Sequence, residues 1–274
     1  MDMMFRSHEF ILLLYFLSLS VLSYDLFFRN RQARKVSFYL VGAGAILHIF
    51  SFVQIGLSLG RFPIQTVFEG IYVLSMLLVI IGIVQYKRSD SEIAFAIYVF
   101  TAFLLLSMYT FAPVTYDEVT EVSAIMNDLL VIHVVLSLLS YVMFFISVLH
   151  AGIYIIQYDN LKKKRFNRLF FSLFSVETAK KMMIRTAILG FLFILIGIFL
   201  GIQWGLYIFG TDILTDLKVL GTLIVLILYG GLLSYLSLTR NIYKFAVANI
   251  VIFIICMMNY LFITQLSSFH FWNY

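Results

Sequence analysis

Hydrophobic residues occur along the chain in eight long runs that short polar segments separate. A helix of about 20 apolar residues spans the ~30 Å hydrocarbon core of a bilayer. The pattern therefore predicts an all-α fold, a polytopic membrane helix bundle with about eight transmembrane helices. The predicted spans are 9–28, 37–59, 66–86, 93–113, 128–157, 186–204, 217–237 and 245–266.

The composition agrees with this pattern. Of the 274 residues, 62% are hydrophobic and only 12% are charged, which is more apolar surface than a soluble domain of this size can bury. Neither a soluble domain nor a repeat of fixed period is recognisable in the sequence. We therefore expect residues 1–274 to form a single integral membrane domain.

Basic residues are sorted between the two sets of connections. One set holds 16 of the 19 Lys and Arg residues, and the other holds only Arg6, Arg61 and Lys218. Because basic residues concentrate in cytoplasmic loops, the rich set is predicted to be inside and both termini outside, in a bacterial cytoplasmic membrane. The net charge of +5 lies mostly in the inner loops, so it does not indicate nucleic-acid binding.

The largest inner loop, about 158–185, is strongly basic around an apolar stretch at 169–174. This pattern predicts a basic amphipathic helix on the inner leaflet, where membrane lipid with anionic headgroups would attract it. A docking surface for a cytosolic partner is the alternative.

Several kinds of chemistry find no support. There is no Ser/His/Asp arrangement, phosphate-cradling glycine loop or pair of carboxylates in a plausible pocket, so we expect no independent catalysis. The single cysteine, Cys256, forms no disulfide within the chain, which argues against thiol redox chemistry. Charged residues within the spans are few and no pair of broken helices is evident, which argues against a transporter.

Two acidic residues near span ends are expected to be paired. Asp25 has Arg29 one helical turn further on, and a local pair explains it. Glu69 begins the third span, so it is expected to face the bundle and meet a donor there.

Histidines are the strongest candidates for chemistry. His48 lies mid-span, where an ionisable residue is a functional hypothesis by default; the alternative is a neutral ring bonded to a neighbouring helix. His133 and His270 both fall at the outer surface. Two imidazoles from different helices can hold a metal, or the iron of a haem from its two faces. Their separation of 137 positions does not establish convergence, and an interfacial tail also explains His270.

These histidines stand in ordered sequence contexts. Residues 60–70, GRFPIQTVFEG, resemble the G-x-F-P-L-S-N-L-Y-E-S segment of the CcsA/CcsB cytochrome c assembly family. The stretch 130–141, LVIHVVLSLLSY, is similar to the family's span that carries its first outer histidine, here His133. His270 stands where the family has its second, and His48 precedes the proline segment as a family transmembrane histidine does.

One family motif is altered. The family's outer loop reads W-G-x-x-W-x-W-D followed by P-K, whereas this chain has WGLYIFGTDILTDLK at 204–218. Trp204, Asp216 and Lys218 match, but the later tryptophans are missing from the predicted outer loop at about 204–216. Since that loop presents haem to an apocytochrome, its alteration weighs against cytochrome c synthesis more than against haem binding.

The resemblance covers nearly the whole chain and is strongest to the HemX-type subgroup. It implies non-covalent haem b handling at the outer face, with His133 and His270 on the iron. For this subgroup it also implies control of the level of glutamyl-tRNA reductase, a possible partner at the cytoplasmic face. Arg61 and Lys218 lie beside family motifs, so we expect them to hold the haem propionates; simple snorkelling is the alternative. His48 is then a second haem position or waystation. The competing hypotheses are haem export for cytochrome c assembly, and a haem-independent scaffold that acts through its basic loop.

Overall fold

A computed structural model describes residues 7–64, 66–89, 91–111 and 128–263 of the chain. Over these residues the chain is helical, and eight of the helices are long and apolar enough to cross a membrane. The predicted all-α fold with eight spans is therefore confirmed.

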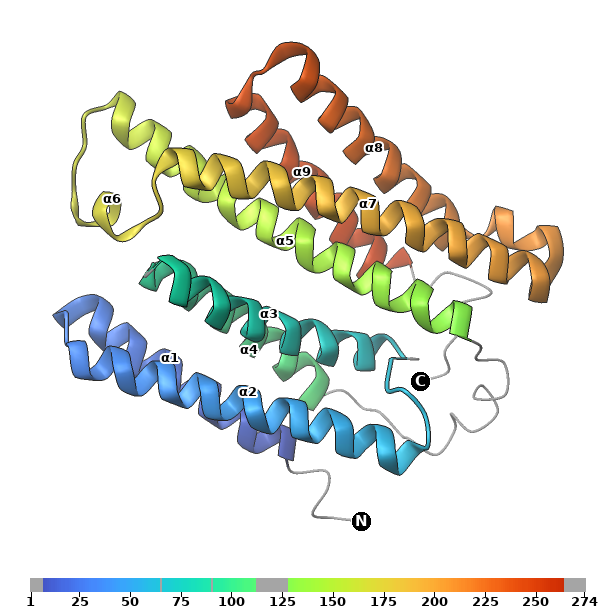
Figure 1. Cartoon of the computed structure of the whole chain (residues 1–274), viewed down its shortest axis with the longest axis horizontal. Coiled ribbons are helices and arrows are strands. Elements are labelled where there is room, and N and C mark those ends of the chain that lie inside the picture. Colours follow the sequence, from blue (N-terminus) through green and yellow to red (C-terminus); the bar gives the residue numbers. More distant parts are fainter. Residues whose placement is uncertain (1–6, 65, 90, 112–127, 264–274) are drawn as a thin grey trace. The chain divides into compact units, whose positions relative to one another are not determined.

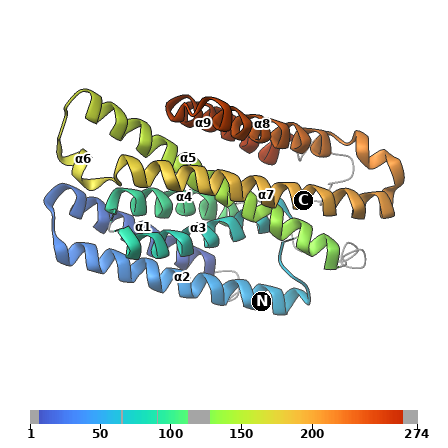
Figure 2. The same cartoon turned by 45° about the horizontal axis from the view of Figure 1, so that its top comes forward.

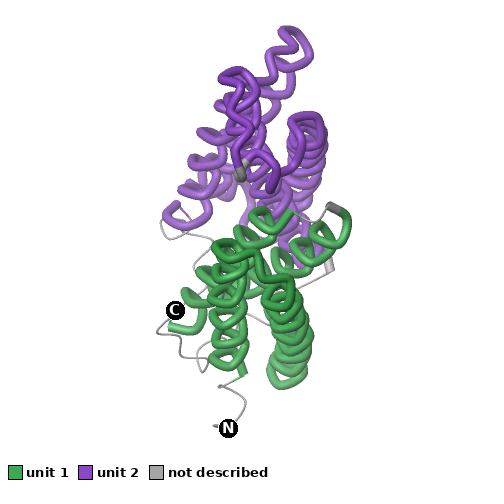
Figure 3. Tube along the Cα trace, turned by 90° about the vertical axis from the view of Figure 1, so that its left-hand side faces the viewer, with its two compact units in different colours: residues 1–118, 274 green, residues 119–273 purple. Residues whose placement is uncertain are grey.

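The chain divides into two compact units, shown in different colours in Figure 3. The sequence pattern had indicated one continuous membrane domain. The first unit contains α1 (Ser7–Phe28), α2 (Arg31–Leu59), α3 (Val67–Ser89) and α4 (Glu92–Thr110). The second unit contains α5 (Asp128–Lys162), α6 (Arg168–Ser172), α7 (Val176–Phe209), the 3₁₀ helix η3 (Gly210–Thr215), α8 (Leu217–Thr239) and α9 (Ile242–Leu261).

Helix boundaries follow local capping chemistry. The Asn30 side chain accepts hydrogen bonds from the amides of Gln32 and Ala33 and begins α2, and Gly60 ends that helix with a φ of 63°. Asn and Ser side chains satisfy the orphan amides at helix starts, and glycine adopts the left-handed region without strain. Ser175 and Asn241 begin α7 and α9 in the same way.

We use two names for the ends of each unit. The basic end of the first unit carries the α1–α2 and α3–α4 connections, and the basic end of the second carries the α5–α7 and α8–α9 connections. The opposite end of each unit is the end away from these connections. The basic ends hold the set of connections that the sequence predicts to be cytoplasmic.

Polar pairs join α1 to α2 along the first unit. The hydroxyls of Ser18 and Ser37 are 2.8 Å apart, and at the basic end Arg34 Nε donates to Asp25 Oδ2 over 2.9 Å. Arg34 also pairs with Glu92 at the start of α4. The predicted local pair of Asp25 with Arg29 is therefore wrong: Arg29 has a positive φ of 53°, and the neighbouring helix supplies the partner.

Arg34 joins three helices, so we expect Arg34→Met to destabilise the first unit by about 3 kcal/mol, because it strands the buried Asp25 carboxylate. Arg29→Met is the matched control and is expected to have little effect, since that side chain is exposed. Thermal unfolding of both variants in detergent tests this ranking. A larger loss of stability in Arg29→Met than in Arg34→Met would instead support the local pair of Asp25 with Arg29.

In the second unit α5 packs most extensively against α7, and the two helices lie side by side (Figure 1, Figure 2). Phe144 of α5 stacks on Tyr229 of α8, with ring centroids 3.7 Å apart, and lies directly on Gly190 of α7. Ser147 accepts a 2.7 Å hydrogen bond from the Asn249 amide and donates to the Met183 carbonyl. These contacts hold α5, α7, α8 and α9 together.

Two predicted connections are shorter in the structure. The inner loop expected at 158–185 is reduced to residues 163–175, because α5 continues to Lys162 and α7 begins at Val176. The only helix within it is the five-residue α6, not a long amphipathic helix. The outer loop expected at 204–216 is also shorter, because α7 continues to Phe209.

Candidate functional site

His133 lies in the second turn of α5, at the opposite end of the second unit, and is half-buried. Its Nδ1 is 2.6 Å from the backbone oxygen of Gly197 on α7. A carbonyl oxygen only accepts, so Nδ1 carries the hydrogen and donates. In the neutral ring the Nε2 atom then carries the lone pair. Metal-binding histidines are commonly oriented by such a bond from their other ring nitrogen.

Gly201 leaves the space on α7 that the His133 ring occupies. A Cβ atom at position 201 would lie 2.5 Å from His133 Cε1 and 2.6 Å from Nδ1, closer than any real contact. Only glycine leaves room for the ring against α7. The sequence GIFLGIQWG at 197–205 places glycine at every fourth position, a spacing that permits close helix approach. That spacing could have indicated a close approach to this face of α7 before the structure did, although not that His133 makes it.

Trp204 lies one turn beyond Gly201 on α7, not in a loop. Its side chain is buried, and Nε1 has no hydrogen-bond partner among the residues that the structure describes. The chain then folds back through η3, whose Ile213 packs closely on Gly205. An indole nitrogen is thus buried at the same end of the unit as His133.

Asp216 and Lys218 also lie at this end. Asp216 Oδ1 accepts hydrogen bonds from the amides of Lys218 (2.9 Å) and Val219 (3.4 Å), so its carboxylate caps α8. This local role accounts for the buried aspartate. Lys218 follows the cap and is half-buried. Its ammonium group is the cation that the sequence placed beside the tryptophan motif.

His48 is enclosed within the first unit. Its Nδ1 is 3.2 Å from the Tyr15 hydroxyl, and the Tyr72 ring meets its ring edge-on at 4.3 Å. The side chain has no exposed surface, while Nε2 has no hydrogen-bond partner within the described part of the chain. The ring is therefore hydrogen-bonded to a neighbouring helix, as one of the two sequence interpretations expected.

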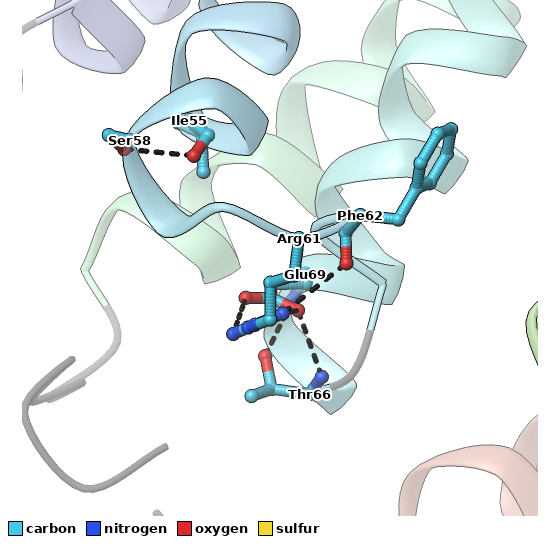
Figure 4. Close-up of polar contacts among 6 residues, drawn as sticks. All are labelled: Ile55, Ser58, Arg61, Phe62, Thr66 and Glu69. Atoms are coloured by element: carbon cyan, nitrogen blue, oxygen red, sulfur yellow. Dashed lines mark hydrogen bonds and ion pairs between the residues drawn. The ribbon is translucent and has the colours of Figure 1, made fainter. Parts of the chain in front are cut away.

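Arg61 and Glu69 form a two-pronged ion pair at the opposite end of the first unit (Figure 4). Arg61 Nη2 donates to Glu69 Oε1 over 2.8 Å, and Nη1 donates to Oε2 over 3.0 Å. Glu69 Oε2 also accepts from the Thr66 amide, while Thr66 Oγ1 accepts from the Glu69 amide. The last two bonds form a capping box that begins α3. The expectation that Glu69 meets a donor is confirmed.

The predicted site residues thus fall in both units. His133, Trp204, Asp216 and Lys218 share one end of the second unit, whereas His48 and Arg61 belong to the first. His270 lies outside the described residues. Within the described ranges no three His, Cys, Asp or Glu side chains gather in a position to hold a metal.

Comparison with known proteins gives a family match over most of the chain. Residues 64–270 match the family described as Cytochrome C assembly protein. The chain is 28% identical over 274 residues to Protein HemX of Bacillus subtilis (strain 168), covering 98% of both chains. It is 29% identical over 256 residues to Protein HemX of Brevibacillus brevis, covering 92% of this chain and 93% of the relative. The family match includes His133, Trp204 and His270.

Proposed function

Because the chain belongs to the cytochrome c assembly protein family, we propose that this multi-pass membrane protein binds haem b non-covalently at the opposite end of its second unit. His133 and His270 are the proposed axial ligands. The observation that carries the proposal is the orientation of His133, whose Nδ1–H is held by the Gly197 carbonyl. That bond leaves Nε2 in the chemical form that iron requires.

The fold supports a meeting of the two histidines. Tyr141 of α5 packs on Tyr260 of α9, and Ser147 of α5 meets Asn249, so the two helices run antiparallel. His133 lies about 12 Å beyond Tyr141 toward the opposite end, at ~1.5 Å per residue. His270 lies seven positions after Ile263, and that length of chain reaches at most about 25 Å. The chain is therefore long enough to bring His270 to the same iron.

The proposed propionate partner in the second unit is Lys218. Lys218 shares the end of that unit with His133, and an ammonium group there suits a carboxylate. Arg61, the other cation that the sequence suggested for a propionate, belongs to the first unit, where it binds the Glu69 carboxylate. Trp204 supplies a buried indole N–H at the same end of the second unit as His133. His48 would bind a second haem only after Tyr15 or Tyr72 moves aside.

In physiological terms we propose that the protein modulates tetrapyrrole synthesis by setting the level of glutamyl-tRNA reductase. The support is the similarity to two relatives named Protein HemX over nearly the full length of each chain. The proposal assigns no catalytic step to the chain and places it in the bacterial cytoplasmic membrane, with both termini outside. Haem is the bound signal. A component that exports haem for cytochrome c assembly is the second candidate, which the family match favours.

The test is an absorption spectrum of the protein purified in detergent from haem-replete cells. We expect a six-coordinate low-spin haem signal in the wild type and its loss in both His133→Ala and His270→Ala. His8→Ala, a histidine of the first unit, is the control and is expected to keep the signal. A colourless wild type would instead favour a scaffold that works without haem.

The regulatory part of the proposal has its own readout. Cells that carry His133→Ala are expected to differ from wild type in glutamyl-tRNA reductase abundance, measured by immunoblot under the same haem supply. An unchanged abundance would separate haem binding from regulation and favour the haem-export candidate.

A further inference from the structure

The α5–α7 connection has a defined conformation. α5 ends at Lys162, and Lys164 just beyond it has a φ of 52°. The amides of Lys163 and Arg165 donate back to the carbonyls of Asp159 (2.9 Å) and Asn160 (2.8 Å). Such paired bonds terminate a helix in a fixed direction. We call residues 162–175 the aromatic–basic segment.

The backbone of the aromatic–basic segment is hydrogen-bonded to α5. Gln157 Nε2 donates to the backbone oxygens of Phe170 (2.9 Å) and Phe174 (2.8 Å). The buried Phe174 ring stacks on His150, with centroids 5.3 Å apart and planes 21° apart. The segment is thus held through its backbone and one buried ring.

The outer side combines cations with large apolar rings. Phe171 is 74% exposed and Phe166 is 56% exposed, and both lie close to the ring of Phe170. The exposed basic side chains beside them are Lys162, Lys163, Lys164 and Arg165. The nearby acid Glu177 is already paired with Lys180 and Lys181. With four cations against the one carboxylate of Asp159 nearby on α5, the outer side carries net positive charge next to exposed aromatic surface.

We propose that the aromatic–basic segment binds anionic phospholipid headgroups of the surrounding membrane, with Phe166 and Phe171 inserted at the headgroup level. The segment joins two membrane-spanning helices, so it lies where headgroups lie. Aromatic rings favour that interface, and basic side chains next to it attract anionic lipid. A soluble acidic partner would satisfy the cations but would leave two large rings without the apolar environment that their exposure requires.

This binding would give the segment a definite role. Four cations held against the leaflet fix the ends of α5 and α7, the two helices that carry His133 and Gly201 at their far ends. A cytosolic protein could reach the segment only by displacing lipid. The proposal therefore favours lipid over protein docking and stands independently of haem binding.

The test uses the full chain in lipid nanodiscs with a tryptophan reporter. Phe171→Trp is combined with Trp204→Phe and Trp272→Phe, so that position 171 holds the sole tryptophan. Brominated phosphatidylglycerol and brominated phosphatidylcholine are compared at equal mole fraction in otherwise identical mixtures. We expect the anionic lipid to quench at least about twofold more strongly.

Replacing Lys162, Lys163, Lys164 and Arg165 with Gln should bring the quenching ratio to about one while leaving quenching by the neutral lipid. Arg240→Gln with Lys244→Gln, which removes charge from the other basic-end connection of the same unit, should leave the ratio high. Equal quenching by both lipids in the reporter protein would overturn the headgroup preference. Absence of quenching by either would place Phe171 in water and favour a protein partner.

Discussion

Replacing Gly201 with alanine is expected to abolish low-spin haem binding while leaving the helical fold intact. The new Cβ would lie 2.5 Å from His133 Cε1, so the ring must leave its place against α7 and give up its 2.6 Å bond to the Gly197 carbonyl. Without that bond neither the tautomer nor the direction of Nε2 is fixed. We expect the absorption spectrum of Gly201→Ala to resemble that of His133→Ala.

Gly152→Ala is the matched control. Gly152 lies on α5, like His133, and a Cβ there meets nothing within 4 Å. The same exchange should slightly stabilise the helix, by up to about 1 kcal/mol, and leave the spectrum unchanged. A reduced signal in both variants would point to a general effect of alanine on the bundle.

A second readout works without haem. ¹⁵N NMR of histidine-labelled apoprotein distinguishes the two neutral tautomers, and we expect His133 to carry its hydrogen on Nδ1 in the wild type only. If Gly201→Ala keeps that tautomer and the wild-type spectrum, Gly201 does not position the ring. If the wild type shows the tautomer but binds no haem, the positioning stands and the haem proposal falls.

Much of the fold was predictable because the bilayer imposes a simple rule on sequence. Runs of about 20 apolar residues identified the spans, but hydropathy detects only the part of a helix that lies in lipid. The fifth and sixth spans were therefore expected at 128–157 and 186–204, whereas α5 and α7 extend to Lys162 and Phe209. The largely polar residues 158–162 continue α5 beyond its apolar run, whereas residues 205–209 of α7 had been assigned to the outer loop on the tryptophan motif.

Side-chain partners were harder to predict, because antiparallel helices bring distant residues together. Asp25 was assigned to Arg29, one turn away, yet Arg34 reaches it from the next helix. The resemblance selected His133, but its partners Gly197 and Gly201 lie 64 and 68 positions further along the chain. Only the spacing of the glycines hinted at a close approach, and spacing alone does not identify which ring fills the space.

Arg61→Met is expected to destabilise the first unit by about 3–5 kcal/mol, the cost of leaving a buried charge without its partner. The Arg61 and Glu69 side chains are only 9% and 3% exposed, so solvent would screen little of the loss. Thermal unfolding in detergent measures the change. Arg88→Met, an exposed position at the other end of α3, is the control and should have little effect.

The double variant Arg61→Met/Glu69→Met is expected to recover much of this loss, because apolar side chains of similar size remove both charges together. Recovery should be incomplete, since Glu69 also accepts a hydrogen bond from the Thr66 amide at the start of α3. A double variant as unstable as Arg61→Met would mean that the turn depends on something other than charge pairing.

Glu69→Gln tests the expectation from the sequence that Arg61 holds a haem propionate. This variant keeps the guanidinium charge but removes the carboxylate that competes for it, so the unfolding temperature should fall while haem retention is maintained. Arg61→Met should lower both, because a propionate then loses its cation. Haem retention is measured as the haem-to-protein ratio after washing with an apoprotein acceptor. An equal loss of haem in the two variants would show that Arg61 acts only through its pair with Glu69, and the propionate contact would have to be assigned to Lys218 alone.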